Sequence, residues 1–126
     1  MTTRFVSMIA IAASATLFAT LAHAQVPIKA AGGVMVDAAG MTIYTFDKDT
    51  AGSGKSACNG PCAALWPPVM AASDAKPDTE WTLVTRDDGT KQWAYKGKPV
   101  YLYAGDKKAG DRTGDNFKDV WHVIKP

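Results

Sequence analysis

The chain has 126 residues, of which 14 are Lys or Arg and 12 are Asp or Glu, giving a formal net charge of +2 at pH 7. No stretch carries five like charges, so neither a tail that binds nucleic acid nor one that binds a membrane surface is indicated. Hydrophobic residues make up 47% of the chain and include four tryptophans. This content is too high for a disordered chain and predicts a folded domain.

Residues 1–24 have the layout of a secretory signal peptide. Arg4 precedes an uncharged apolar run that ends at Leu21, and Ala22-His23-Ala24 follows as a cleavage site. A membrane anchor is the alternative, because the run approaches the ~20 residues needed to cross a bilayer. Its many Ala, Ser and Thr residues favour cleavage, and no cysteine follows to accept a lipid. We predict a periplasmic or secreted domain, residues 25–126, without a membrane anchor.

The exported part is predicted to form short strands separated by turns. Glycine-containing turns at 38–40 and 96–98 each join two alternating segments, which is a hairpin signal. Residues 62–66 are the one plausible helical turn, which Pro67 ends. Residues 71–80 are polar and read as a linker. The predicted strands are residues 34–37, 41–46, 81–86, 92–95 and 99–103, with a Trp-led strand closing each half.

An internal repeat organises this domain. Tyr44, Phe46 and Asp49 recur 57 positions later as Tyr101, Tyr103 and Asp106, and Trp66 is matched by Trp121. A constant offset over several positions indicates two tandem units, at about 32–70 and 81–126. One unit has too few strands to be stable alone. The predicted fold is mostly β, a small antiparallel domain built from two hairpin-containing repeats with at most one short helical turn.

The repeated aromatic residues alternate along their strands. Tyr44 and Phe46 share one face of their strand, and Tyr101 and Tyr103 share one face of theirs. We interpret these rings as core, since aromatic residues bury large apolar areas. The alternative is an aromatic platform for a sugar or another flat ligand.

Cys58 and Cys62 are the only cysteines. Export places them where thiols oxidise in pairs, and Gly60-Pro61 allows the tight turn that a local disulfide needs. The alternative is a periplasmic metal or thiol-redox accessory. Thiolates favour copper, and a C-x-x-x-C pair with a distant histidine, here His122, is similar to the ligand set of Sco-type copper chaperones. Thioether ligands for such a site are available at Met35, Met41 and Met70.

The doubled motif Y-x-[FYW]-x-x-D, present at 44–49 and 101–106, resembles the secreted-repeat family of predicted bacterial lipoproteins. The cysteine pair followed by Leu65-Trp66-Pro67-Pro68 is similar to the first repeat of that family. The resemblance covers nearly the whole exported part. It implies export and a two-repeat architecture, and it implies no established molecular function. This chain lacks the lipid-accepting cysteine of the lipoprotein members.

The residues present do not indicate catalysis. His122 is the only histidine after the signal, and we interpret it as a surface residue. Asp49 and Asp106 are equivalent carboxylates that are expected to cap the turns after their strands, with a carboxylate pair as the alternative. Residues 47–53 begin like a calcium loop, but the twelfth position is Cys58.

We therefore predict an exported envelope protein of unknown molecular function. The expected role is that of a non-enzymatic, monomeric binding or interaction module without a cofactor. Its partner would be a small molecule or an envelope protein, contacted through the Gly/Asp/Lys loops or the aromatic faces.

Overall fold

The computed structural model describes residues 27–126, so the predicted signal peptide, residues 1–24, lies outside the described residues. Short antiparallel strands dominate, which confirms the predicted mostly-β fold class. In the described part, no helix combines the length and the hydropathy needed to cross a membrane. The elements are β1 (Lys29–Ala31), β2 (Val34–Val36), β3 (Tyr44–Phe46), α1 (Pro61–Leu65), β4 (Met70–Ala71), β5 (Trp81–Thr85), β6 (Lys91–Tyr95), β7 (Lys98–Tyr101), the 3-10 turn η1 (Phe117–Asp119) and β8 (Trp121–Val123).

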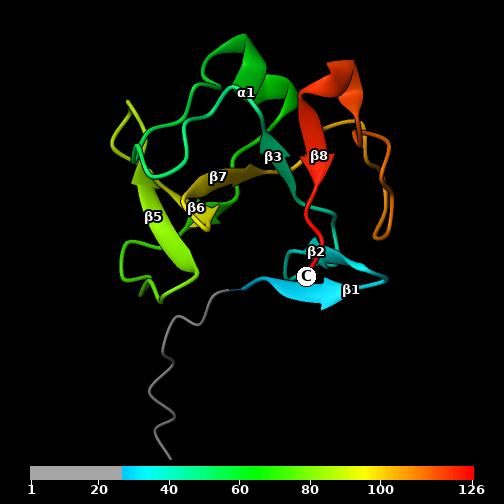
Figure 1. Cartoon of the computed structure of the whole chain (residues 1–126), viewed down its shortest axis with the longest axis horizontal. Helices are drawn as coiled ribbons and strands as arrows, with labels where there is room; N and C mark the ends of the chain where they lie inside the picture. Colours follow the sequence, from blue (N-terminus) through cyan, green and yellow to red (C-terminus); the bar gives the residue numbers. More distant parts are fainter. Residues whose placement is uncertain (1–26) are drawn as a thin grey trace, which may run out of the picture.

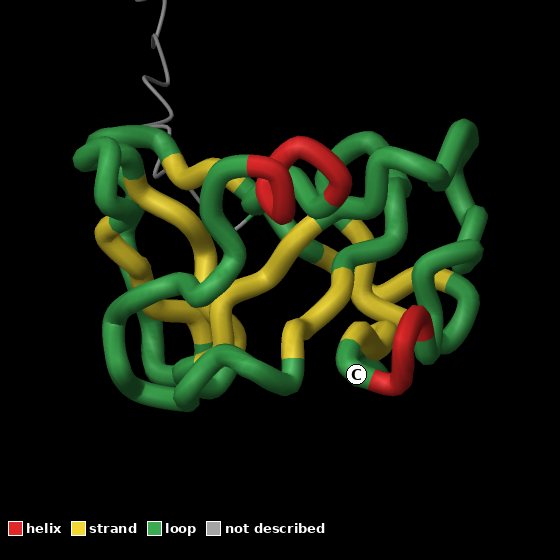
Figure 2. Tube along the Cα trace, turned by 90° about the horizontal axis from the view of Figure 1, so that it is seen from above, coloured by secondary structure: helices red, strands yellow, loops and turns green. Residues whose placement is uncertain are grey.

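The strands form two sheets. The larger sheet has the order β4-β6-β7-β3-β8. Strand β5 lies outside this order and pairs with β6. The smaller sheet contains only β1 and β2, which lie beside the C-terminal residues (Figure 1). Figure 2 shows that strands cross the middle of the molecule and that loops form most of its perimeter. Long loops rather than strands therefore supply much of the surface that a partner would meet.

The hairpin between β6 and β7 depends on its two-residue turn. Lys98 pairs with Tyr95, so only Lys96 and Gly97 form the connection, one residue fewer than the predicted 96–98. Both residues have positive φ, 49° and 83°. The twist of this backbone conformation matches the twist of the flanking strands. A Cβ on Gly97 would also lie 2.8 Å from the backbone nitrogen of Gly52, so this position accepts only glycine.

Several element boundaries differ from the predicted ones. Strand β3 is three residues long because Thr42 makes only an isolated bridge, with Val36. The Trp-led strand expected after Trp66 is reduced to a bridge at Pro68 and the short β4, since proline cannot donate to a ladder. Strand β1 and turn η1 were not predicted; η1 contains positive-φ residues and so lacks helical periodicity.

The core lies on both faces of the central strands. The neighbours of the motif tyrosines, Ile43 and Val100, point to a cluster that includes Trp81 and Trp93. Tyr44 and Tyr101 point to a second, aromatic cluster. Both sides of β3 and β7 are therefore covered, which is why a chain of this length buries rings on the two faces of one sheet.

The two repeats exchange segments. We call residues 66–69 and 121–124 the Trp-led segments, and residues 32–70 and 81–126 the first and second repeats. The segment of the second repeat forms β8 and pairs with β3 of the first repeat, Tyr44 opposite Val123. The segment of the first repeat lies against β7 of the second repeat, Pro68 opposite Tyr101. Each repeat thus completes the sheet of the other.

The backbone hydrogen bonds of this exchange come in matched pairs. Met35 N–H donates to the Ile124 carbonyl at 2.8 Å, and its counterpart Trp93 N–H donates to the Val69 carbonyl at 2.9 Å. At the other end of the segments, Asp47 N–H donates to Val120 and Ala104 N–H donates to Leu65, both at 2.8 Å. The exchange is reciprocal, so the unit of folding is the pair of repeats.

Candidate functional site

The repeated motif residues meet their own counterparts in the centre of the molecule. Tyr44 lies opposite Tyr101 in the β3–β7 ladder, and both side chains are fully buried. Trp66 and Trp121 stack with ring centroids 3.8 Å apart. Phe46 continues the stack on Trp121 at 4.2 Å, and Tyr103 continues it on Trp66 at 4.3 Å. The four rings form one column, in which both faces of Trp66 and Trp121 are covered by neighbouring rings.

The motif aspartates accept hydrogen bonds across the repeats. The Tyr44 hydroxyl donates to Asp106 Oδ2, and the Tyr101 hydroxyl donates to Asp49 Oδ2, both at 2.6 Å. The other oxygen of each carboxylate accepts a backbone N–H from its own loop, Ala57 on Asp49 and Thr113 on Asp106. Each aspartate therefore closes a long loop and receives a tyrosine of the other repeat.

Burial sets the protonation of this network. Desolvation raises the pKa of the Tyr44 and Tyr101 hydroxyls well above the usual tyrosine value, and the hydrogen bonds to the aspartates add to this effect. Desolvation also raises the pKa of Asp49, partly offset by the hydroxyl of Tyr101 and by the charge of Arg86. These buried residues join the two repeats through hydrogen bonds between their side chains.

The raised tyrosine pKa values predict alkaline sensitivity. Below about pH 10 both states keep these protons and the stabilisation is complete, whereas above it only the unfolded chain releases them. Two such phenols should lower the free energy of unfolding by about 2.7 kcal/mol in all between pH 9 and 11, with a slope that rises as the unfolded tyrosines ionise. Urea unfolding between pH 9 and 11 measures this slope, and Tyr101→Phe should show half of it. Phenolate absorbance from both residues in the folded protein near pH 10 would contradict the prediction.

His122 lies at the surface, apart from the buried network. Its Nε2 is 2.8 Å from Asp47 Oδ2, and its Nδ1 is 3.1 Å from Asn116 Oδ1. Cys58 and Cys62 form a disulfide with Cα atoms 5.2 Å apart, so their sulfur atoms are engaged with each other. Among residues 27–126, no group of three His, Cys, Asp or Glu side chains is arranged to hold a metal ion.

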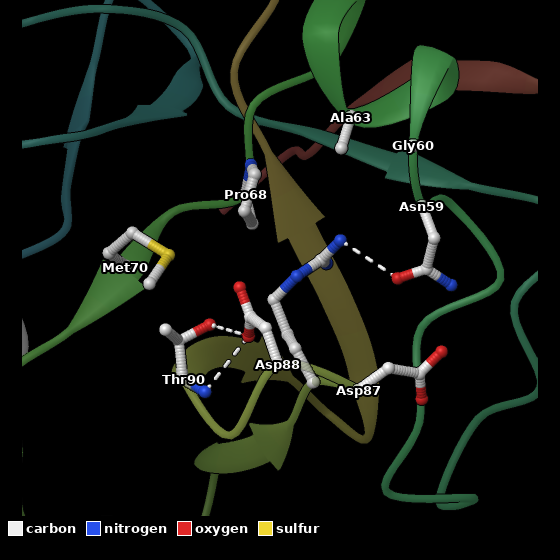
Figure 3. Close-up of a pocket in the computed structure, with 9 residues that line it drawn as sticks. Asn59, Gly60, Ala63, Pro68, Met70, Asp87, Asp88 and Thr90 are labelled. Carbon is white, nitrogen blue, oxygen red and sulfur yellow. Dashed lines mark hydrogen bonds between the residues drawn. The ribbon is translucent and has the colours of Figure 1, made fainter.

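The loop between the two cysteines forms one wall of a surface pocket of about 370 Å³ (Figure 3). Asn59 and Gly60 come from the loop between the cysteines, and Ala63 comes from α1. Pro68 and Met70 lie across the pocket on the segment that leads into β4. Met70 is 49% exposed, so an apolar side chain remains open to solvent beside the disulfide.

Arg86, at the end of β5, lines the same pocket. Its side chain is only 8% exposed, and it donates from Nη1 to Gln92 Oε1 at 2.7 Å and from Nη2 to the Cys58 carbonyl at 2.7 Å and Asn59 Oδ1 at 3.1 Å. All three acceptors are neutral. The one ion pair among residues 27–126 joins His122 and Asp47, so the guanidinium charge has no carboxylate in contact. A buried charge that has hydrogen bonds but no ion-pair partner is uncommon, which makes Arg86 the unusual group of this pocket.

Two carboxylates follow Arg86 in the chain and stand on the rim of the pocket. Asp87 and Asp88 belong to the exposed turn between β5 and β6, and both line the pocket. The hydroxyl and the amide of Thr90 donate to Asp88 Oδ1 at 2.6 and 3.0 Å. These bonds hold the pKa of Asp88 below its usual value, so the rim is anionic at neutral pH. The pocket thus combines one buried cation, exposed anions and an apolar wall; we call it the Arg86 pocket.

Sequence reasoning did not single out Arg86. It is one arginine ahead of a turn, and nothing in its spacing shows that it is buried or that the cysteine loop lies over it. Met70 was considered only as a possible copper ligand, whereas in the structure it lines the Arg86 pocket.

A family model described as a secreted repeat of unknown function matches the chain twice, at residues 26–70 and 82–125. The two matches agree with the repeats derived from the Tyr and Trp positions. No curated protein and no solved structure matches the chain.

Proposed function

The chain belongs to this family of secreted repeats of unknown function, and we propose that it is an exported binding module that holds a small amphoteric molecule in the Arg86 pocket. The ligand would carry a carboxylate, an ammonium group and an apolar side chain, as a free amino acid does. The buried guanidinium of Arg86, which lines the pocket and has no carboxylate in direct contact, is the observation that carries the proposal.

The charges of the pocket support this ligand class. Guanidinium is always protonated, and an N–H group of Nη1 that does not donate to the protein can donate to a ligand carboxylate in a charge-assisted hydrogen bond. Of its five N–H groups, three donations to protein atoms are accounted for. Asp87 and Asp88 do not pair with Arg86 although they line the same pocket, so both signs of charge remain available. A simple anion would be repelled by this rim, whereas a molecule with both charges satisfies all three residues.

The walls support the same ligand class. Ala63, Pro68 and Met70 offer apolar surface beside the charged groups, and methionine adapts to side chains of different shape. We propose binding without conversion, because the lining residues do not combine a nucleophile with a histidine base.

L-leucine is the first probe. Calorimetric titration should show that leucine binds at least about tenfold more tightly than leucinamide, which lacks the carboxylate, or N-acetylleucine, which lacks the ammonium group. The double variant Asp87→Asn, Asp88→Asn should lose about tenfold in affinity for leucine and none for N-acetylleucine.

Asp74→Asn is the matched control, because Asp74 is exposed and does not line the pocket. It should bind leucine like the unaltered protein. Equal affinity for leucine and leucinamide, or an unchanged affinity in the double variant, would show that these charges do not select the ligand.

A further inference from the structure

A second pocket, of about 360 Å³, lies at the other end of the β6–β7 hairpin from the Arg86 site. Its lining comes from the turn of that hairpin, from β3, and from the C-terminal end of β8. Half-buried Tyr95 and Val123 and buried Ile124 make it apolar. We call it the lysine pocket, after the three charged residues described next.

Every charged residue that lines this pocket is a lysine: Lys96, Lys98 and Lys125. None of the three is in an ion pair within the described part of the chain. The ammonium of Lys96 lies 5.2 Å from the centre of the Tyr95 ring, within cation–π range, so it is held at the rim. Three cations beside an apolar surface are complementary to an anion that carries an apolar tail.

The backbone keeps Lys96 at this rim. Lys96 occupies a positive-φ position where hairpin turns favour asparagine, aspartate or glycine. Its N–H donates to the Glu80 carbonyl at 2.7 Å. The wall opposite is fastened by a 2.9 Å bond from Gly52 N–H to the Gly97 carbonyl, which brings Ala51 to the pocket. Lys96 therefore occupies a turn position that other residues suit better, and it lines the cavity.

We infer that the lysine pocket is a binding site for a soluble carboxylate with an apolar chain, such as a medium-chain fatty acid. The carboxylate is held among the three ammonium groups, and the chain lies on Tyr95, Val123 and Ile124. This site does not depend on the Arg86 pocket, since the two share no lining residue.

Octanoate is the test ligand. Its binding to the full exported chain is monitored through the backbone amide NMR signals of Lys96, Gly97 and Lys125. These signals should shift saturably with octanoate, much less with acetate and not with octylamine. Lys96→Asn should lower octanoate affinity about tenfold. The same change should raise the melting temperature, because Asn-Gly suits this turn. If Lys96 served only the fold, its replacement by asparagine would not lower octanoate affinity while raising the melting temperature.

Lys76→Gln is the matched control, since Lys76 is exposed and outside the pocket; its octanoate affinity should be unchanged. Lys98→Gln and Lys125→Gln should each weaken binding. Vesicles of phosphatidylglycerol distinguish a lipid surface from a soluble carboxylate: octanoate should bind without them and compete with any adsorption. Equal shifts with octanoate and octylamine, adsorption to vesicles that octanoate does not reduce, or full affinity in Lys96→Asn would each overturn the inference.

Discussion

Residues 27–75 and 76–126, produced as separate chains, are each expected to be unfolded. The first half would lack β8, which pairs with β3, and the second would lack the segment that bridges to β7 at Pro68. Each would also lose half of the Phe46–Trp121–Trp66–Tyr103 column. Far-ultraviolet circular dichroism and amide NMR dispersion of each half measure the result, and mixing the halves should restore both signals.

The matched control keeps the two halves together. A protease site placed at residues 74–76 lies in the segment between β4 and β5, where no strand pairing is interrupted. Cleavage there should leave the folded complex intact. A dispersed spectrum from either half alone would show that a single repeat is a folding unit and that the exchange of segments is secondary.

Trp66→Ala is expected to remove a large share of the stability of the full chain. The ring stacks on Trp121 at 3.8 Å and on Tyr103 at 4.3 Å, and it meets Tyr44 edge-on at 5.3 Å. Replacing a buried tryptophan by alanine costs about 3–5 kcal/mol, against a total of about 5–15 kcal/mol for a typical domain. Urea unfolding of the two proteins gives the difference in the free energy of unfolding.

Leu65→Ala is the control for this prediction. Leu65 is the neighbouring residue and is 57% exposed, so its truncation should change the free energy of unfolding by no more than about 0.5 kcal/mol. A loss below about 1 kcal/mol for Trp66→Ala would mean that the column relaxes into the cavity, and the stacked geometry would then not be the main support of the core.

Much of the architecture can be predicted from the sequence because it depends on short-range patterns and on the internal repeat. Alternation predicts that Tyr44 and Phe46 share one face of their strand and that Tyr101 and Tyr103 share one face of theirs, and all four rings belong to the aromatic cluster. Glycine at 40 and 97 predicts the hairpins. The constant offset between Tyr44 and Tyr101 predicts two repeats, which the two family matches confirm. These inferences need only neighbouring residues or a comparison of the chain with itself.

The partners of the repeated residues could not be predicted in the same way. Nothing within the 44–49 motif shows that the Tyr44 hydroxyl donates to Asp106 rather than to an acceptor in its own repeat. The aspartates were expected to cap local turns, and they also receive tyrosines from the other repeat. Such pairing depends on how two distant segments are placed in the fold, and a local sequence pattern carries no information about that placement.

The sequence by itself predicts an export signal, and it determines a β-rich domain and two equivalent units, because periodicity, turn residues and self-similarity can be read directly along the chain. Only the tertiary structure decides that the units exchange their Trp-led segments, that Arg86 is buried against the cysteine loop, and that three lysines surround one apolar pocket. The physical reason is that a binding site consists of charges and surfaces brought together from separate strands. Their proximity is set by packing of the whole core, to which every segment of the chain contributes.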